Sequence, residues 1–342
     1  MRRLLNTLYV TTPDSYLARE GENIIIRIGE EIVFRVPVHN IEGIVYFGYP
    51  GASPALLGLC AERGITVSFL TEYGKFLARL EGPVSGNVLL RRKQYRMADE
   101  ENRVSLLANY FIAAKIMNCR SVLQRGRRDH PDKVGADIER SIALMASSAK
   151  NVISAGKLDE IRGLEGDAAQ RYFSEIDNLI LDQKTDFFMV SRSRRPPLDR
   201  FNALLSFFYT LLAHESRSAL ESVGLDTAVG FLHRDRPGRP SLALDLMEEL
   251  RPYMADRFVL SLINRKQISK NDFVENENGA VYVTQDVRKT LLTAWQKRKQ
   301  EEIIHPYLGE KIPLGLLPYT QALLLARFLR GDLDAYPAFI WK

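Results

Sequence analysis

Two segments of the 342-residue chain place acidic side chains where an apolar helix face is expected, and the first is residues 162–173, RGLEGDAAQRYF. If this segment is helical, Glu165 shares its face with Ala168 and Tyr172. A carboxylate removed from water needs a cation, a metal ion or hydrogen-bond donors to offset a desolvation cost of several kcal/mol. The alternative is an acid near a helix N-terminus that complements the helix dipole.

The second segment, residues 230–250, places a histidine on a loop before an acidic helix. Ser241 is a suitable N-cap for this helix, in which Asp245 and Glu248 are i, i+3 neighbours. Because the two acids then point the same way, His233 on the preceding loop can reach the face that they share. The segment therefore predicts a cluster of one imidazole and two carboxylates.

The donor atoms of such a cluster decide which ion it would hold. One imidazole and two carboxylates form a hard, mostly oxygen site that suits Mg²⁺ or Mn²⁺. Zinc prefers more nitrogen or sulfur ligands. The alternative is that Glu248 and Glu249 belong to a solvated helix face and that His233 is an ordinary loop histidine.

Arginine side chains are concentrated near these segments. Phosphodiester chemistry requires such cations, because they neutralise phosphates while a metal ion activates a nucleophile and stabilises the leaving oxygen. The predicted DNA-binding residues are Arg192, Arg194, Arg195, Arg234, Arg236 and Arg239. The alternative for each of them singly is a role in surface solubility. The basic runs at 91–93, 125–128 and 297–299 are predicted as solvated helix faces, although duplex binding could use them.

The first of the elements that must position these residues are β-strands. Strands are predicted over residues 23–28, 31–36, 41–47, 66–70 and 75–80. Gly29 turns the first two strands into a hairpin, and a helix is predicted from Ser53 and Pro54 to Gly64. The turn-rich segment 81–86 ends this pattern and marks a domain boundary.

From residue 87 onward the apolar residues recur at helical spacing, for example at Leu107, Tyr110 and Phe111. Loops are predicted over residues 125–132, 191–198, 230–240 and 271–279. The sequence therefore predicts an α+β protein, with an N-terminal β-rich domain over residues 1–86 and a mainly α-helical catalytic domain over residues 87–342.

Composition narrows the class of protein. The net charge is +5, with 8 basic and 9 acidic residues among the first 86 and 39 against 33 in the rest. The basic excess of the second domain favours polyanionic partners, and the first domain is expected to make protein contacts. No apolar stretch reaches the about 18 residues of a membrane helix, so a cytoplasmic protein without membrane contact is expected. Cys60 and Cys119 lie among apolar neighbours, as reduced core cysteines do.

Three segments together resemble the universal CRISPR-associated spacer-acquisition integrase, a family once described as metal-dependent DNA endonucleases. They are RGLEGDAAQRYF at 162–173, NALLSFFYTLL at 202–212 and GLDTAVGFLHRDRPGRPSLALDLMEELRP at 224–252. The closing residues 336–342, with the segment 266–299, look like the subtype I-C branch of the family.

This resemblance implies a divalent metal ion, Mg²⁺ or Mn²⁺, held by Glu165, His233 and Glu248 as catalytic residues. Asp245 is implied as an accessory acid, and Asn202 and Tyr209 match positions that shape the site. The resemblance also implies a homodimer that binds double-stranded DNA, both spacer precursor and repeat, together with a small ferredoxin-like CRISPR adaptation protein. Such an assembly in a prokaryotic cell inserts a short duplex at the leader end of a repeat array.

The expected reaction is attack of a DNA 3′-hydroxyl on a target phosphodiester, without a covalent enzyme intermediate. The nearest alternative is an endonuclease or junction resolvase that uses water as the nucleophile at the same metal. A second alternative is a non-catalytic DNA-binding scaffold in which the ligand-like residues form a buried ionic cluster. A metalloenzyme that acts on a small phosphorylated metabolite also fits the donor atoms, but it explains neither the arginines nor the resemblance.

Overall fold

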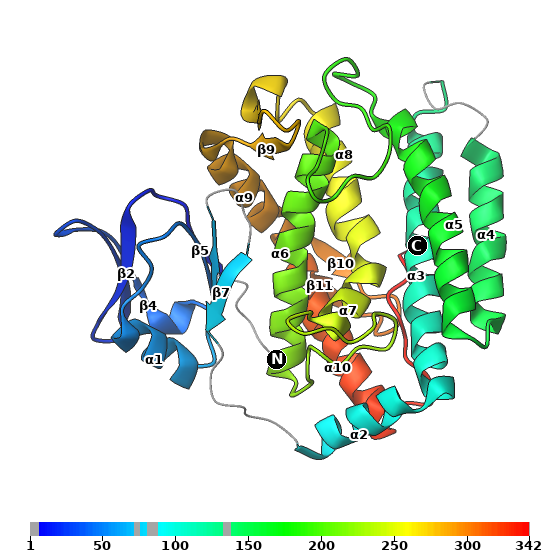
Figure 1. The fold of residues 1–342 in the computed structure, drawn as a ribbon, viewed down its shortest axis with the longest axis horizontal. Coiled ribbons are helices and arrows are strands. Elements are labelled where there is room, and N and C mark those ends of the chain that lie inside the picture. The colour runs from blue at the N-terminus through cyan, green and yellow to red at the C-terminus, as the bar shows by residue number, and fades with distance from the viewer. Residues whose placement is uncertain (1–6, 72–75, 81–87, 133–137, 342) are drawn as a thin grey trace. The chain divides into compact units, whose positions relative to one another are not determined.

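The computed structural model describes residues 7–71, 76–80, 88–132 and 138–341 (Figure 1). The chain forms two compact units. The first contains residues 1–86, 284–301 and 313–316, and the second contains residues 87–283, 302–312 and 317–342. The predicted division into 1–86 and 87–342 differs from these units, because two later segments belong to the first one.

The first unit contains two sheets. The antiparallel sheet has the order β2 (Ser15–Glu20), β3 (Asn23–Ile28), β4 (Glu31–Pro37). The mixed sheet has the order β1 (Thr7–Val10), β5 (Gly43–Phe47), β6 (Thr66–Leu70), β7 (Phe76–Leu80), in which only β7 runs antiparallel to its neighbour. The predicted hairpin around Gly29 is confirmed, and this glycine has the positive φ of 58° that its turn requires.

Helix α1 (Pro54–Glu62) connects β5 to β6 and confirms the predicted start, because the Ser53 side chain accepts a hydrogen bond from the Leu56 N–H at 3.2 Å. The later helix α9 (Gln285–Gln300) joins the same unit. Its Gln296 amide donates to the Thr7 carbonyl at 2.8 Å, and Arg288 lies over the Phe47 ring at 5.4 Å. Periodicity identifies α9 as amphipathic but does not say which core it covers, and the predicted boundary therefore missed it.

The second unit is mainly helical, which confirms the predicted α+β class. Its longer helices are α2 (Val88–Asp99), α3 (Glu101–Asp129), α4 (Ile138–Ser154), α5 (Leu158–Ile176), α6 (Arg200–Ser222), α7 (Ser241–Arg251), α8 (Arg257–Asn264) and α10 (Leu317–Arg330). A π-helical turn, Pro252–Asp256, joins α7 to α8. Short 3₁₀ turns occur in both units. Val38–Asn40 and Leu314–Leu316 belong to the first unit, and Asp177–Leu179 and Lys270–Asp272 belong to the second.

Two predicted loops differ from the structure. Helix α3 continues to Asp129, so most of the loop predicted over 125–132 is helical. The loop predicted over 271–279 contains β8 (Phe273–Glu275), which pairs with β9 (Val281–Val283) in a short hairpin. A second hairpin joins β10 (Glu302–Ile304) to β11 (Lys311–Pro313). The loops over 191–198 and 230–240 are confirmed.

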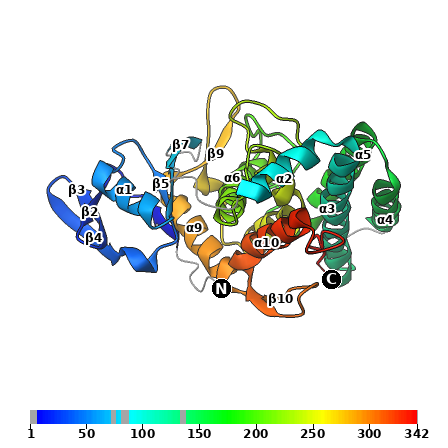
Figure 2. The same cartoon turned by 90° about the horizontal axis from the view of Figure 1, so that it is seen from below.

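Helix α3 is central to the packing of the helical unit. It packs against α4, α5 and α7, and the two views show α3, α4 and α5 side by side (Figures 1 and 2). Leu107, Phe111 and Ile112 of α3 are buried, so the helical period predicted from these residues is confirmed. Helix α6 packs on α7 and α10. None of the helices in the described part of the chain is long and apolar enough to span a membrane.

The two cysteines are buried and unpaired, as predicted. Burial raises the pKa of the Cys60 thiol to about 11 and also raises the pKa of Cys119. Both thiols are therefore protonated and unreactive near neutral pH.

Candidate active site

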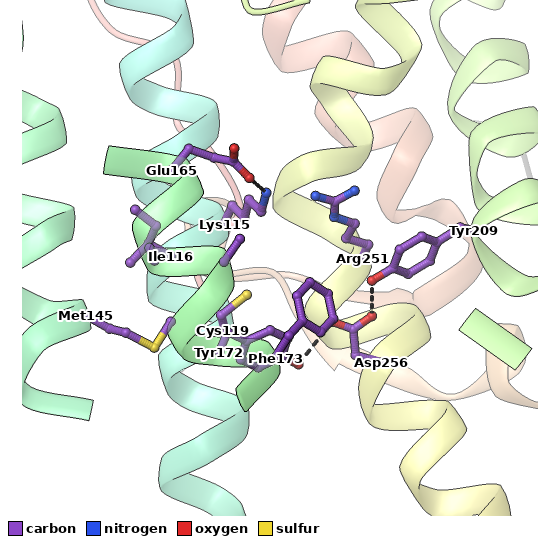
Figure 3. A pocket seen from close by; sticks show the side chains of 12 residues that line it. Lys115, Ile116, Cys119, Met145, Glu165, Tyr172, Phe173, Tyr209, Arg251 and Asp256 are labelled. Atoms are coloured by element: carbon purple, nitrogen blue, oxygen red, sulfur yellow. Dashed lines mark hydrogen bonds and ion pairs between the residues drawn. The ribbon is translucent and has the colours of Figure 1, made fainter. Parts of the chain in front are cut away.

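Glu165 lies in the middle of α5, because this helix begins at Leu158. The alternative of an acid that complements the N-terminal dipole is therefore wrong, since that effect is confined to the first turn. Its side chain is 27% exposed and forms an ion pair with the ammonium of Lys115 on α3 (Figure 3). The side chain of Lys115 is only 5% exposed, so Glu165 faces a buried cation.

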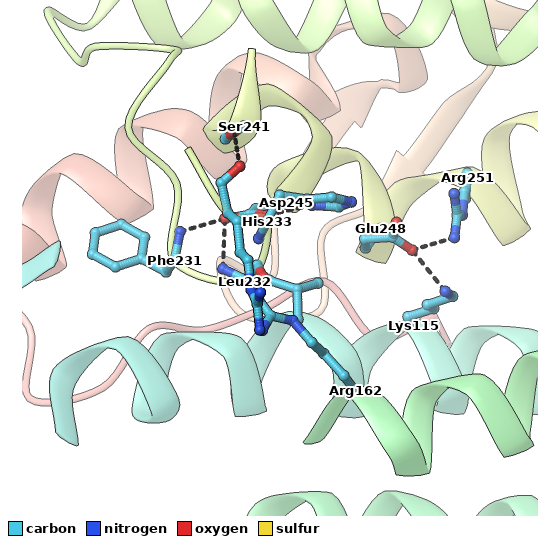
Figure 4. A network of polar contacts seen from close by, with 10 residues as sticks. Lys115, Arg162, Phe231, Leu232, His233, Ser241, Asp245, Glu248 and Arg251 are labelled. Atoms are coloured by element: carbon cyan, nitrogen blue, oxygen red, sulfur yellow. Dashed lines mark hydrogen bonds and ion pairs between the residues drawn. The ribbon is translucent and has the colours of Figure 1, made fainter. Parts of the chain in front are cut away.

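The same ammonium reaches Glu248 on α7. Lys115 Nζ lies 2.8 Å from Glu248 Oε2, which also forms an ion pair with Arg251 one turn later (Figure 4). Burial by itself would raise the pKa of Glu248, but the positive charges of Arg251 and Lys115 lower it to about 2. Glu248 is therefore a buried and fully ionised carboxylate at neutral pH.

Asp245 holds the loop that carries His233. Its Oδ2 accepts from the backbone N–H groups of Phe231 at 2.6 Å and Leu232 at 3.0 Å. Its Oδ1 accepts from the N–H of His233 at 3.0 Å and lies 2.6 Å from His233 Nδ1 (Figure 4). Gly230 is required here, because a Cβ would lie 2.8 Å from Asp245 Oδ2.

This arrangement separates the roles of the two acids of α7. A carboxylate can only accept, so Nδ1 of His233 carries a proton. In the neutral imidazole, Nε2 is then the nitrogen with the lone pair that a metal ion needs. Asp245 therefore orients the histidine, while Glu248 contacts the cations. Ser241 is the first helical residue instead of the N-cap, a position held by Pro240, and its hydroxyl donates to the Arg234 carbonyl at 3.2 Å.

The described residues do not bring three His, Cys, Asp or Glu side chains together in metal-binding geometry. The ammonium of Lys115 instead occupies the space between Glu165 and Glu248. His233 lies near enough to Glu248 for an electrostatic interaction between them. The donor set thus fits a hard divalent cation in its chemistry, and the two glutamates are already arranged around one positive charge.

Asn202 and Tyr209, both on α6, contact arginine side chains of this region. Asn202 Oδ1 accepts from Arg192 Nη1 at 2.6 Å, and its amide donates to the Ser191 carbonyl at 2.8 Å. Arg192 and Arg251 both lie over the Tyr209 ring, with each guanidinium carbon 5.3 Å from the ring centroid. Tyr209 therefore contacts the arginine that pairs with Glu248, whereas Asn202 contacts Arg192.

The predicted DNA-binding arginines fall into two groups. Arg192 donates a hydrogen bond to Asn202 and lies over the Tyr209 ring, and burial lowers its pKa. Four others have exposed side chains, namely Arg194, Arg195, Arg234 and Arg236, and Arg239 is partly buried. Of these arginines, only the four exposed ones face solvent, where they could contact DNA.

Three charged residues of this region were not predicted from the sequence: Lys115, Arg251 and Asp256. Asp256 accepts from the hydroxyl of Tyr209 at 2.6 Å and of Tyr172 at 3.0 Å (Figure 3). Lys115 could have been found, because it is the single charge in the apolar run IAAKIM at 112–117. It is the same kind of signal that identified Glu165.

Glu249 is not part of a solvated face, and that alternative is wrong for Glu248 as well, because both are buried. Glu249 accepts from the Tyr336 hydroxyl at 2.6 Å, the Gln321 amide at 2.9 Å and the Phe339 N–H at 2.9 Å. These donors are neutral, and burial raises the pKa of Glu249 to about 7. The residue anchors the C-terminal segment to α7.

Comparison with known proteins shows the family of the chain. The sequence profile of the family described as "CRISPR associated protein Cas1" matches residues 8–297. The chain is 54% identical to the CRISPR-associated endonuclease Cas1 1 of Chlorobaculum tepidum and 52% identical to the CRISPR-associated endonuclease Cas1 2 of Rhodospirillum rubrum. Both alignments cover all of this chain and all of the relative.

Solved structures share the fold. The structure of TM1797, a CAS1 protein from Thermotoga maritima, is 24% identical with a TM-score of 0.81, over 95% of this chain and 97% of that one. A casposase bound to integration product is also 24% identical, with a TM-score of 0.84, over 98% of this chain and 94% of that one. The sequence identity, the extent of the matches and the fold agree, and the chain therefore belongs to the Cas1 family of CRISPR-associated endonucleases.

Proposed function

We propose that this protein is a metal-dependent DNA integrase of CRISPR adaptation, which joins short duplex DNA to a repeat array. The observation that supports this most strongly is the pair of glutamates, Glu165 and Glu248, on two helices around one positive charge. The imidazole of His233, oriented by Asp245, completes a donor set for Mg²⁺ or Mn²⁺.

Each side chain has a distinct part in the proposed reaction. Glu165 and Glu248 supply the negative charge that holds the ion, and His233 supplies a neutral nitrogen through Nε2. When bound, the ion would lower the pKa of the attacking 3′-hydroxyl and stabilise charge on the target phosphate. Release of Lys115 from the glutamates would leave its ammonium beside Arg251 to neutralise the phosphodiester.

The proposed substrate and partners agree with two structural neighbours. One neighbour is a casposase bound to integration product, and another belongs to a Cas6-RT-Cas1–Cas2 complex. By analogy we infer a homodimer that binds duplex DNA and a small ferredoxin-like partner. The nearly neutral charge of residues 1–86 supports protein contacts there. The closing residues 336–342 support a place in the subtype I-C branch.

The test is strand transfer of a labelled short duplex into a supercoiled plasmid that bears a repeat. The reaction is run with Mg²⁺ or Mn²⁺ and with chelator, and wild type is compared with Glu165→Ala. Covalent joining that requires metal and is lost in the variant is the expected result. The small partner protein is included in one set of reactions, so that its absence does not mask activity.

A hydrolytic endonuclease is the second candidate, and the names of the relatives favour it. Metal-dependent nicking without joined product, with the partner protein present, would support hydrolysis over integration. Duplex binding without any reaction would instead favour a scaffold, in which Lys115 and the two glutamates form only a buried ionic cluster.

A further inference from the structure

Lys115 is a buried cation with few partners. It lies on α3 in the apolar run 112–117, and its side chain is 5% exposed. Among the described residues, the only anions that its ammonium contacts are the carboxylates of Glu165 and Glu248. An ammonium removed from water requires such partners, because burial of an unpaired charge is strongly unfavourable. The position of Lys115 therefore depends on the two glutamates.

The two glutamates depend on the ammonium in the same way. Glu165 comes from α5 and Glu248 from α7, and α3 packs against both helices (Figures 3 and 4). Two carboxylates that face the same space repel each other, and the repulsion grows as water is excluded. The ammonium, which enters from a third helix, offsets this repulsion. Lys115 thus joins three helices through one charge.

The contact with Glu248 leaves part of that carboxylate unsatisfied. Its Oε2 atom is buried and lies 2.8 Å from Lys115 Nζ, and Arg251 contacts the same oxygen. Neither cation donates a hydrogen bond to this oxygen, and no other donor in the described part of the chain does so. A buried acceptor without a hydrogen bond is unusual in a folded protein. A metal ion, which needs no donor hydrogen, would satisfy this oxygen directly.

The charges of the cluster determine how it responds to a divalent ion. Glu165 and Glu248 carry two negative charges, and Lys115 and Arg251 carry two positive ones, so the four side chains are balanced. An ion held by both glutamates would compete for the space that the ammonium occupies and would add two positive charges there. Repulsion between the ion and the ammonium therefore opposes metal binding as long as Lys115 stays in place.

We propose that Lys115 is a resident cation that competes with the divalent metal ion for Glu165 and Glu248. It holds the two glutamates together before the ion binds, and its ammonium must leave both of them when the ion enters. Lys115 is thus a positioning residue that raises the metal concentration at which the site fills. The inference rests on the proposed function, because that function requires the metal ion. A purely structural role predicts the opposite sign, since loss of a structural residue would weaken metal binding.

The test is Lys115→Met, which keeps an unbranched side chain of similar length and removes the charge. Binding of Mn²⁺ to the metal-free full chain is measured by electron paramagnetic resonance, which reports free Mn²⁺. We expect the dissociation constant of the variant to be about tenfold lower than that of wild type, because one contacting positive charge is gone. The matched control is Lys184→Met. Lys184 pairs with Asp177 at 2.6 Å, outside the cluster, so this variant should bind Mn²⁺ as wild type does.

Thermal unfolding provides a second readout that does not depend on catalysis. With chelator, Lys115→Met should unfold at a lower temperature than wild type, because two carboxylates then face each other without their cation. Mn²⁺ should raise the unfolding temperature of the variant by more than that of wild type, since tighter binding stabilises the folded state more. Addition of Glu248→Gln to Lys115→Met should relieve the repulsion and abolish this extra stabilisation. If the single variant folds poorly, its recovery during refolding with Mn²⁺ is measured instead.

An unchanged or weaker affinity for Mn²⁺ in Lys115→Met would overturn the proposal, and so would refolding that Mn²⁺ does not improve. Metal-dependent strand transfer by wild type, measured alongside, separates these failures from failure of the proposed function. If wild type joins DNA and the variant binds Mn²⁺ no more tightly, the function stands and only the role of Lys115 is wrong. If neither protein binds Mn²⁺ and wild type does not join DNA, the function is wrong and the inference fails with it.

Discussion

Glu248 and Glu249 are consecutive buried acids on α7 with opposite electrostatic surroundings. Glu248 contacts two cations, Lys115 and Arg251, which hold its pKa at about 2. Glu249 contacts a phenol, an amide and a backbone N–H, and burial raises its pKa to about 7. Burial alone therefore does not decide whether a buried carboxylate is charged; the charge of its partners decides it.

The largest expected effect comes from neutralising the acid that faces the cations. Glu248→Gln should abolish strand transfer, a loss of more than about 100-fold, because it removes charge from the proposed metal site. The rate is measured with saturating Mn²⁺ on the labelled duplex. The control is Glu249→Gln, whose amide oxygen can still accept from Tyr336 and Gln321, and it should keep nearly full activity. An equal loss of strand-transfer rate in both variants would mean that Glu248, like Glu249, acts only through the packing of α7.

The next effect separates the ligand from the residue that orients it. His233→Ala should abolish strand transfer and leave duplex binding largely intact, since the side chain acts at the reacting phosphate. Asp245→Asn should cost about 10–100-fold, as expected for a residue that positions a metal-bound histidine. Duplex affinity measured by anisotropy is the second readout. Parallel loss of binding and joining in His233→Ala would show a structural role instead.

A third prediction concerns stability and pH. The folded-state pKa of Glu249, about 7, is above its usual value of 4.5, so the folded protein binds more protons than the unfolded chain between these values. This group therefore makes the protein less stable as the pH rises from about 4.5 to 7, with a slope of at most about 1.4 kcal/mol per pH unit. Glu248 acts in the opposite direction, because its stabilising contribution is lost as the pH falls from about 4.5 to 2.

Urea denaturation of wild type and Glu249→Gln across this pH range measures the first effect. The variant cannot ionise, so its stability relative to wild type should improve as the pH approaches 7. A constant difference between the two proteins would show that Glu249 does not titrate in this range.

The smallest effect is expected at the exposed arginines. Arg236→Ala should weaken duplex binding only a few-fold and reduce the salt slope by about 1, as for one lost phosphate contact. Arg192→Ala should instead reduce strand transfer at saturating DNA. Arg192 and Arg251 lie over the same Tyr209 ring, so loss of Arg192 would disturb the arginine that pairs with Glu248. Anisotropy titrations at several salt concentrations, paired with single-turnover joining, distinguish the two. If both variants changed the salt dependence of duplex affinity and the joining rate in the same way, the buried and exposed arginines would not have different roles.

Much of the fold could be predicted from local patterns. The hairpin around Gly29, the helix that starts at Ser53 and the long helices of the second unit follow from periodicity and capping residues. The helix end at Asp129 was missed, because a basic run suits a solvated helix as well as a loop. The joining of α9 to the first unit could not be predicted, since an amphipathic helix does not encode which core it covers.

The candidate site, like the fold, has a part that the sequence indicates and a part that only tertiary packing decides. Residue types and spacing indicated Glu165, His233, Asp245 and Glu248 as candidates, because an acid on an apolar helix face is visible in the sequence alone. Only the family resemblance implied Glu165, His233 and Glu248 as one set of metal ligands. Their electrostatic state depends on Lys115, which is 50 positions from Glu165 and on another helix. Only tertiary packing brings that ammonium between the two glutamates and surrounds Glu249 with neutral donors, because side-chain partners are set by which helix faces meet.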